Sequence, residues 1–566
     1  MQTRQRPIDA SAASALAAAG VPPLLARLYA ARGVGSIDEL DAGLAGLLPW
    51  DTLKGIDAAA QRLAQAITRQ ERIVIVGDYD ADGATATALG MLGLRALGAQ
   101  VDFLVPDRLT LGYGLSPGVV EIAAQLQPDL LVTVDNGIAA LDGVAAAQAR
   151  GIDVLVTDHH LPGERLPPCI VVNPNQPGCG FGSRCIAGVG VMFYVLLALR
   201  ARLRAEGVLP TAADGSPGGP NLAQWLDIVA LGTVADVVRL DRNNRILVAQ
   251  GLARIRAGRA RPGLLALLRL AGREHWCASS TDLGFALGPR INAAGRIADM
   301  RIGIDCLLAD EPAEAERLAQ RLDALNRERR ELQADMLAQA QAALADVQVA
   351  DGASICLYDA NWHPGIVGLL AGRLKDAYHR PTIVFAPDAN GVLKGSGRSI
   401  AGLHLRDAID LVDRRHPGLI RQFGGHAAAA GLSLDADAWA PFAATFEQVC
   451  REWLGPAALQ RLVETDGPLD AADCNAELVE QLHAAVWGQG FPPPAFDDVF
   501  EVLEQRVVGS GHLKLTLQHA GARRPAILFG RAEPLPPRIR AVFAPAINTW
   551  NGRTSVEFML QDWQPA

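Results

Sequence analysis

Residues 74–88, VIVGDYDADGATATA, hold the densest group of side chains that could do chemistry. Asp78, Asp80 and Asp82 alternate there, directly after an apolar run, and Gly83 with further small residues follows. On an extended segment alternate side chains share one face, and three carboxylates on one face repel each other unless a cation lies between them. Carboxylate oxygens suit Mg²⁺ or Mn²⁺, so the segment predicts a metal site. The alternatives are an acidic turn or a calcium loop, although an EF-hand needs a Glu at its twelfth position and flanking helices.

More acids stand at positions where the chain leaves apolar runs. Asp135 follows LLVTV (130–134), Asp158 opens a Asp-His-His triplet after DVLVT (153–157), and Asp236 closes IVALGTVAD. One such Asp is commonly a helix cap, and one such His is commonly a satisfied polar residue. Acids at three successive strand ends, together with a histidine pair, are harder to explain in that way. They predict a mixed carboxylate and imidazole site for two Mn²⁺ or Mg²⁺ ions, which could bind a phosphodiester and activate water.

The elements that must position these side chains alternate between strand and helix. This order predicts a mostly parallel sheet covered on both faces, with ligands beyond the carboxyl ends of its strands. The expected strands are 72–76, 101–105, 130–134, 153–157 and 169–172, and the expected helices are 84–97, 116–126 and 139–149.

Beyond this sheet the pattern changes twice. Residues 311–346 contain no Gly, and no Pro after Pro312, so we expect a continuous helix of about 50 Å that bridges two domains. A second α/β unit follows, and the last ~70 residues carry turn signals typical of a small β-barrel. The expected domains are an N-terminal helical appendage (1–48), a catalytic α/β domain (49–310), the bridging helix (311–349), a smaller α/β domain (350–455) and an OB-like nucleic-acid-binding barrel (466–566).

Composition limits the kind of partner and compartment. The net charge of −9 argues against a generally basic surface, so nucleic acid would need local basic patches or bound metal. Residues 506–540 offer such a patch, with seven Arg or Lys, Lys514 among them, against the single acid Glu533. None of the eight cysteines forms a CxxC pair, and the spacing of Cys169, Cys179 and Cys185 matches no common zinc pattern, so we expect free thiols. With no signal-peptide core and no apolar stretch of ~18–20 residues, we expect a cytoplasmic protein without a membrane contact.

Four motifs in this order, GDYDADG, VTVDNG, TDHH and VAD, resemble the metal-binding motifs of the DHH phosphoesterase superfamily. The resemblance implies that Asp78 is a ligand or orients one, that Asp158 orients the histidines, and that His160 lies near the phosphate as an acid/base or positioning group. The metal ligands that the resemblance implies are Asp80, Asp82, Asp135, His159 and Asp236.

Other segments resemble the RecJ family of exonucleases within this superfamily. They are VPDRLTLGYGLS (105–116), LGPRINAAGRI (287–297), WHPGIVGLLAGRL (362–374), LKGSGRSIAGLHL (393–405) and QFGGHAAAAGLSL (422–434), and GHLKLTLQ (511–518) resembles the family's oligonucleotide-binding domain more weakly. The resemblance implies that the two α/β domains face a common cleft. The implied substrate contacts are Arg108 near the scissile or adjacent phosphate, Arg290, Ser396 and Arg398 near the 5′ end or its phosphate, Gly424, Gly425 and His426 on phosphate, Lys514 in the barrel, and Arg296.

The resemblance implies an exonuclease that digests single-stranded DNA from 5′ to 3′ in recombination and repair, as a monomer, with single-strand-binding protein as a partner. One alternative is a DHH enzyme for short oligoribonucleotides or cyclic dinucleotides, although so small a substrate needs neither the basic barrel nor the long helix. Another alternative is a non-catalytic scaffold of the same fold, but such proteins lose metal-binding acids that this chain keeps.

Overall fold

The computed structural model describes residues 2–107, 113–209, 211, 218–345, 351–509, 511–550 and 553–566. The chain forms two compact units. The larger unit contains Gln5–Ala324 and Glu464–Ala566, and the smaller unit contains Met1–Arg4 and Leu325–Val463. Among the described residues, no helix combines the length and the apolar character that crossing a bilayer requires.

A five-stranded parallel sheet lies at the centre of the larger unit, as the sequence predicts. The order of its strands is β3-β2-β4-β5-β6. The chain adds β3 on one side of β2 and then crosses to the other side to form β4, so the strand order switches between β2 and β4. Open α/β sheets bind ligands at such a switch point. The strands are β2 (Arg72–Gly77), β3 (Gln100–Leu104), β4 (Leu130–Val134), β5 (Asp153–Thr157) and β6 (Ile170–Val172).

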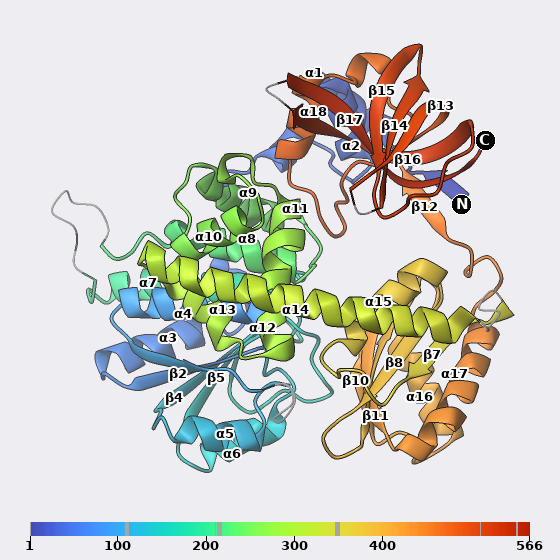
Figure 1. The fold of residues 1–566 in the computed structure, drawn as a ribbon. Coiled ribbons are helices and arrows are strands. Elements are labelled where there is room, and N and C mark those ends of the chain that lie inside the picture. Colours follow the sequence, from blue (N-terminus) through green and yellow to red (C-terminus); the bar gives the residue numbers. More distant parts are fainter. Residues whose placement is uncertain are drawn as a thin grey trace. The chain divides into compact units, whose positions relative to one another are not determined.

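Helices cover both faces of this sheet (Figure 1). Val74 and Val76 of β2 belong to the core beneath α5 and α6, while Ile75 contacts α4 on the opposite face. The alternation arises because successive strand residues point to opposite faces. The covering helices are α3 (Ile56–Thr68), α4 (Ala81–Ala96) and α7 (Gly188–Ala205) on one face, and α5 (Pro117–Ala124) and α6 (Leu141–Gln148) on the other.

The register places the chemistry-bearing strand ends side by side. Val134, the last residue of β4, pairs with Gly77 of β2 and with Thr157 of β5. The next residues are therefore Asp78, Asp135 and Asp158, all at one edge of the sheet. A helical layer then follows along the chain, made of α8 (Leu226–Ala235), α9 (Arg242–Arg256), α10 (Pro262–Leu270), α11 (Ser280–Asp282), the π-helical turn η6 (Leu283–Leu287), α12 (Gly288–Ile297), α13 (Arg301–Leu308) and α14 (Pro312–Ala345).

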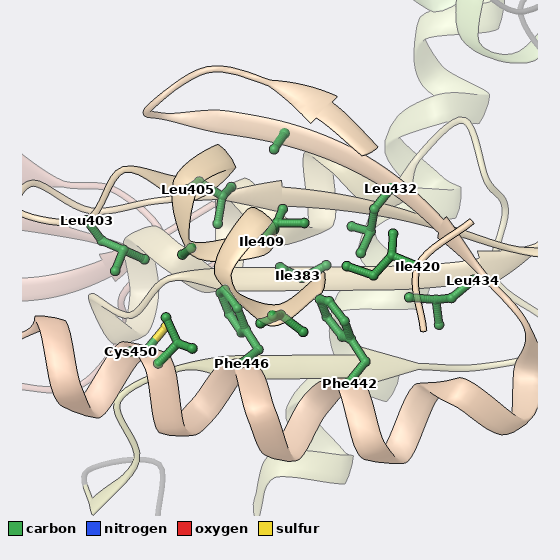
Figure 2. Packing of buried hydrophobic residues seen from close by; sticks show 14 of the residues in the cluster. Ile383, Leu403, Leu405, Ile409, Ile420, Leu432, Leu434, Phe442, Phe446 and Cys450 are labelled. Atoms are coloured by element: carbon green, nitrogen blue, oxygen red, sulfur yellow. The ribbon is translucent and has the colours of Figure 1, made fainter. Parts of the chain in front are cut away.

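The smaller unit is a second α/β layer. Its sheet has the order β10-β11-β9-β8-β7, and only the β7–β8 pair is parallel among the described strands. Figure 2 shows Phe442 and Phe446 packing beside Ile383 and Leu432 in its core. The elements are β7 (Ile355–Tyr358), α15 (Val367–Tyr378), β8 (Thr382–Pro387), β9 (Leu393–Arg398), α16 (Leu405–Arg415), β10 (Gln422–Gly425), β11 (Ala429–Leu434), α17 (Trp439–Trp453) and β12 (Leu462–Thr465).

A closed five-stranded barrel ends the chain, as its turn signals predict. Four fully buried phenylalanines fill it: Phe496, Phe500, Phe543 and Phe558. The barrel strands are β13 (Phe496–Val508), β14 (His512–His519), β15 (Ala522–Leu528), β16 (Arg538–Trp550) and β17 (Arg553–Pro565), preceded by α18 (Ala476–Ala484). The N-terminal segment contains β1 (Gln2–Gln5), a strand that the sequence did not predict, before the helices α1 (Ala10–Ala18) and α2 (Pro23–Ala30).

Candidate metal centre

The first aspartates lie in a turn that becomes a helix earlier than the sequence suggests. Asp80 caps α4, because its carboxylate accepts hydrogen bonds from the backbone N–H groups of Asp82 (2.9 Å) and Gly83 (3.0 Å). A capping Asp satisfies the free donors of a first helical turn, so the helix begins at once. The expectation of one extended face with three carboxylates is therefore wrong for Asp82, which lies inside α4.

Asp82 instead points to the start of another helix. It is almost completely buried and accepts hydrogen bonds from Gly188 N (2.6 Å) and Val189 N (2.9 Å), the first residues of α7. A helix N-terminus favours a negative charge. Burial nevertheless raises the pKa of Asp82 to about 7, and repulsion from Asp80 adds to the effect. The protein supplies too little positive charge here for the carboxylate to ionise readily.

Asp135 occupies a backbone conformation that few side chains adopt. Its φ is +62°, and its side chain is buried. Space for it depends on Gly188, where a Cβ atom would lie 2.7 Å from the Asp135 Cβ. Burial raises the Asp135 pKa well above its ordinary value, and repulsion from Asp82 and Asp80 raises it further. Residues held in sparsely populated backbone conformations cluster at functional sites.

His159 and Asp236, both partly exposed, complete the cluster. The His159 Nε2 atom lies 3.0 Å from Asp135 Oδ1, 3.5 Å from Asp236 Oδ2 and 3.9 Å from Asp82 Oδ2. Asp236 stands at the C-cap of α8, so IVALGTVA is a helix and this acid arrives from outside the sheet. Burial, followed by repulsion from Asp82, raises the Asp236 pKa well above its ordinary value.

The ligand atoms form overlapping groups in which all members lie within 4.8 Å of one another. Asp135 belongs to groups on both sides of the cluster, so its two oxygens could serve two ions. The groups are Asp82 with His159 and Asp236, Asp78 with Asp80 and Asp135, and Asp135 with His159 and His160.

This donor set fits divalent cations. The Asp135 Oδ1 and Asp236 Oδ2 atoms are buried and accept no hydrogen bond from the described part of the chain. Buried polar atoms are normally satisfied, and an unsatisfied one calls for an explanation such as a bound ion. Oxygen ligands with one imidazole suit Mg²⁺ and Mn²⁺, and cations would remove the repulsion that raises these pKa values.

Asp158 orients the histidine pair rather than joining the cluster. Its Oδ1 atom lies 2.8 Å from His160 Nδ1 and accepts from the backbone N–H of His159 (2.7 Å) and His160 (3.0 Å). Burial alone would lower the pKa of His160, but its hydrogen bond and attraction to Asp158 raise that pKa to about 9. An imidazole held in this way stays protonated at neutral pH and can donate through Nε2.

Three polar residues that the sequence analysis missed support these groups. Asn292 Oδ1, on α12, accepts the Ala81 N–H (2.8 Å) and so braces the acidic turn from 211 positions away. Asn175 Nδ2 donates to the His159 carbonyl (2.6 Å), and Tyr113 Oη donates to the Asp135 carbonyl (3.0 Å). Asn175 follows the last strand of the sheet, a position that could have identified it, whereas nothing in the sequence singles out Asn292.

The expected phosphate-binding arginines occupy different environments. Arg108 lies outside the described residues. Arg290 is buried, pairs with Asp323 of α14 (2.9 Å) and donates to the Ala286 carbonyl (2.6 Å), so in this structure its charge is already matched. Arg296 is half-buried on the same helix.

In the smaller unit, the expected substrate residues lie on neighbouring strands. Ser396 and Arg398 share one face of β9, and the Arg398 Nη1 atom donates to Ser396 Oγ (3.2 Å). Two strands away in the sheet, Gly424 and Gly425 end β10, and His426 follows with its backbone N–H donated to Ala429 O (2.8 Å). The structure thus brings Ser396, Arg398, Gly424 and Gly425 into one sheet, with His426 directly after it.

The barrel is less basic than its local sequence suggests. Lys514 on β14 is paired with Glu557 on β17, and Arg540 is paired with Asp497 (2.8 Å). Both acids come from strands outside the 506–540 stretch, so counting charges along the chain missed them. Among the aromatic side chains of the barrel region, Phe543 is fully buried and Phe529 is exposed.

All eight cysteines are free thiols, as expected. Among the described residues, none takes part in a group that could hold a metal ion. Cys185 donates to Asp241 Oδ2 (3.2 Å), so the three clustered positions in the sequence form no knuckle.

Three protein-family models match the chain. The model of the DHH family, N-terminal domain, matches residues 72–233, that of the DHHA1 domain matches 348–452, and that of the RecJ OB domain matches 465–562. The first match covers the sheet whose edge carries Asp78, Asp135 and Asp158.

Several similar proteins are named single-stranded-DNA-specific exonuclease RecJ. Single-stranded-DNA-specific exonuclease RecJ of Salmonella typhimurium is 50% identical over 526 residues, which are 92% of this chain and 90% of that protein. RecJ of Thermus thermophilus is 34% identical over 559 residues, 97% of this chain and 76% of that protein. The crystal structure of Thermus thermophilus RecJ in complex with Mn²⁺ covers 100% of this chain and 79% of its own, with a TM-score of 0.83 and 32% identity, and the complex with Mg²⁺ gives a TM-score of 0.77.

Proposed function

This chain belongs to the RecJ family of single-stranded-DNA-specific exonucleases, and from that premise we propose that it removes nucleotides from the 5′ end of single-stranded DNA by hydrolysis at the Asp/His cluster. The observation that carries the proposal is the buried Asp135 carboxylate, whose Oδ1 atom accepts no hydrogen bond from the described residues and whose pKa is raised by burial and by repulsion from neighbouring aspartates. A site of this kind should bind divalent cations, and metal-dependent phosphodiester hydrolysis needs such cations.

Two ions of Mn²⁺ or Mg²⁺ bound here would polarise the phosphodiester and lower the pKa of the attacking water. In the proposal, Asp82, His159 and Asp236 hold one ion, Asp78 and Asp80 hold the other, and Asp135 contributes to both. The support is that Asp135 groups with Asp78 and Asp80 and also with His159, which in turn groups with Asp82 and Asp236. Gly188 leaves the room that this shared carboxylate needs.

His160 acts on the phosphate from beside the ions. Asp158 fixes the ring through Nδ1 and keeps it protonated, so Nε2 can donate to a phosphate oxygen or to the leaving oxygen. Asp158 is therefore a positioning residue, and His160 is the catalytic residue of the pair.

The remaining contacts belong to the DNA backbone. We assign the phosphate near the scissile bond to Arg108, and phosphates toward the 5′ end to Ser396, Arg398, Gly424, Gly425 and His426. Arg296 is a further substrate contact in the proposal. Glycines let backbone N–H groups approach phosphate oxygens, and arginine offers a fork of donors. Arg290 would also bind a phosphate if it released its ion pair with Asp323. Lys514 would do the same if it released its ion pair with Glu557.

The barrel favours a polymeric substrate over short oligoribonucleotides, since its residues match the RecJ OB domain. Barrels of this type bind single strands by charge and stacking. The proposal further includes a role in DNA recombination and repair, a monomeric state, a cytoplasmic location, and single-strand-binding protein as a partner.

A time course with end-labelled DNA tests the proposal. A 5′-phosphorylated single-stranded 20-mer should lose nucleotides from its 5′ end in Mn²⁺, while the duplex form and a chelator-treated reaction stay intact. A dinucleotide should be a much poorer substrate. Faster cleavage of the dinucleotide, or release from the 3′ end, would overturn the assignment.

A further inference from the structure

Phe285 is the most exposed large apolar side chain in the described part of the chain, with 79% of its surface accessible. It stands on η6, a single π-helical turn in which the Gly288 N–H bonds to the Leu283 carbonyl. Pro289 helps to explain the turn, because it lacks the N–H that an α-helix would direct to the Phe285 carbonyl. Turns of this type occur frequently at functional sites.

The turn lies against the last residues before a proposed metal ligand. A Cβ atom at Gly284 would lie 3.2 Å from Val234 Cγ1, and one at Gly288 would lie 3.1 Å from Ala235 Cβ. Asp236 is the next residue of the chain. Phe285 is thus carried on backbone that touches the end of α8, directly beside the metal centre.

The opposite end of the same segment touches the acidic turn. Asn292 accepts the Ala81 N–H, and a Cβ atom at Gly295 would lie 1.9 Å from the Tyr79 carbonyl. Residues 284–295 therefore run along the cluster from Asp236 to Asp80. Phe285 is uncovered on a segment whose two ends contact the residues next to Asp236 and next to Asp80.

Three more exposed apolar side chains adjoin the same cluster. Val237 follows Asp236 in a left-handed conformation (φ +62°) and is 63% exposed, and Leu161 follows His160 and is 62% exposed. Tyr113, half exposed, bonds to the Asp135 carbonyl. We name Tyr113, Leu161, Val237 and Phe285 the apolar rim.

We propose that the apolar rim, with Phe285 as its main contact, takes the base faces of the terminal nucleotides while their phosphates lie at the acidic cluster. This inference rests on the proposed function. A ligand that must satisfy both a cation-loaded cluster and bare apolar side chains needs an anionic part beside a flat apolar part, which is the chemistry of a nucleotide. In a duplex each base face is already stacked on its neighbours, so only a flexible single strand can turn its bases to the rim. Phe285 is accordingly a determinant of strand specificity.

Substitution of Phe285, combined with removal of the bases, tests this contact. Two 5′-phosphorylated 20-mers are compared in Mn²⁺, one normal and one with abasic residues at its three 5′-terminal positions. On the normal strand, Phe285→Ala should raise KM about tenfold, in line with the loss of one base–aromatic stack, and change kcat by less than about twofold. On the abasic strand, Phe285→Ala and the unaltered protein should have the same KM.

Two further variants make the result specific. Phe285→Trp should restore the KM on the normal strand, because it keeps an aromatic face. Trp276→Ala removes another exposed aromatic side chain of the same unit and should leave KM unchanged. Equal effects of Phe285→Ala on both strands, no effect on either, or an equal loss in Trp276→Ala would overturn the inference. If the unaltered protein digests no single strand at all, it is the proposed function that fails.

Discussion

Buried acids at two places in the larger unit differ in whether cationic side chains surround them. Asp466, near the start of the barrel segment, is 3% exposed, and its carboxylate contacts Arg6 (3.1 Å), Arg32 (2.9 Å) and the Ala495 N–H (3.0 Å). Every charge there has a partner. At the metal centre, Asp82 and Asp135 are similarly buried and Asp236 is partly exposed, and burial followed by repulsion from neighbouring aspartates raises the pKa of all three.

This difference separates a structural charge from a functional one. A buried acid with a complete set of partners fastens elements together, and Asp466 joins the N-terminal helices to the barrel in this way, with Arg32 also stacked over Trp487 at 5.1 Å. A buried acid without partners lowers the stability of the fold unless a ligand compensates it. At the metal centre, the fold therefore loses stability when no cation is bound.

Asp135→Asn should have the largest effect, because it removes the carboxylate that we assign to both ions. We expect kcat in Mn²⁺ to fall about a thousandfold or more, since ion contacts are worth several kcal/mol in the transition state. The metal-free variant should melt at a higher temperature than the unaltered protein, because the repulsion is gone. A variant that keeps activity within about tenfold would contradict the role of Asp135.

Asp466→Asn should lower the stability of the fold and leave metal binding unchanged, the reverse of Asp135→Asn. The buried Arg32 guanidinium loses its counter-charge, and the partly buried Arg6 keeps only Glu464 at 3.9 Å. We therefore expect the free energy of unfolding to fall by about 3 kcal/mol in urea denaturation. The affinity for Mn²⁺, measured by isothermal titration at a temperature where the variant is folded, should not change. A weaker Mn²⁺ affinity would break the distinction between the two groups.

His160→Gln should lower kcat about a hundredfold while leaving the Mn²⁺ affinity intact, as expected for the loss of a protonated donor. Steady-state kinetics on the labelled 20-mer, together with Mn²⁺ titration, provides both readouts. If the variant loses metal and activity together, His160 is a ligand instead.

The metal-free protein should become less stable as pH rises. The folded-state pKa of Asp82 is raised to about 7, above the 3.8 of an ordinary Asp, so its contribution to stability is complete below pH ~4 and disappears as pH rises toward 7. Asp135 and Asp236 shift in the same direction and extend the loss to higher pH. Melting scans should show that Mn²⁺ raises the melting temperature more at pH 7.5 than at pH 5, whereas an equal rise at both would contradict the raised pKa values.

Asn292→Ala should have the smallest effect, a roughly tenfold loss of Mn²⁺ affinity, because only the brace of the acidic turn is removed. Asn292→Asp keeps an acceptor for the Ala81 N–H and should recover part of the affinity. Unchanged affinity in Asn292→Ala would show that Asp80 alone holds the turn.

The parts of the site that sequence could predict are those fixed by topology. Parallel strands bring their carboxyl ends to one edge, so Asp135 and Asp158 were placed correctly beside the first acidic turn. The sequence did not show whether residues 78–82 form an extended segment or the start of a helix. The capping hydrogen bonds of Asp80 start α4 early, and as a result the Asp82 side chain points to α7.

Partners that arrive from distant segments could not be predicted. The charge of Arg290 is matched by Asp323 and that of Lys514 by Glu557, each pair more than thirty positions apart in the sequence. Such pairs depend on how elements pack, which no local pattern encodes. The exposure of Phe285 is likewise a property of the folded surface.

Anomalous diffraction from crystals grown with Mn²⁺ tests most directly whether the buried acids exist to hold cations. We expect two peaks, one among Asp82, His159 and Asp236 and one among Asp78 and Asp80, with Asp135 within about 2.3 Å of both. No peak within coordination distance of Asp135 would contradict the account.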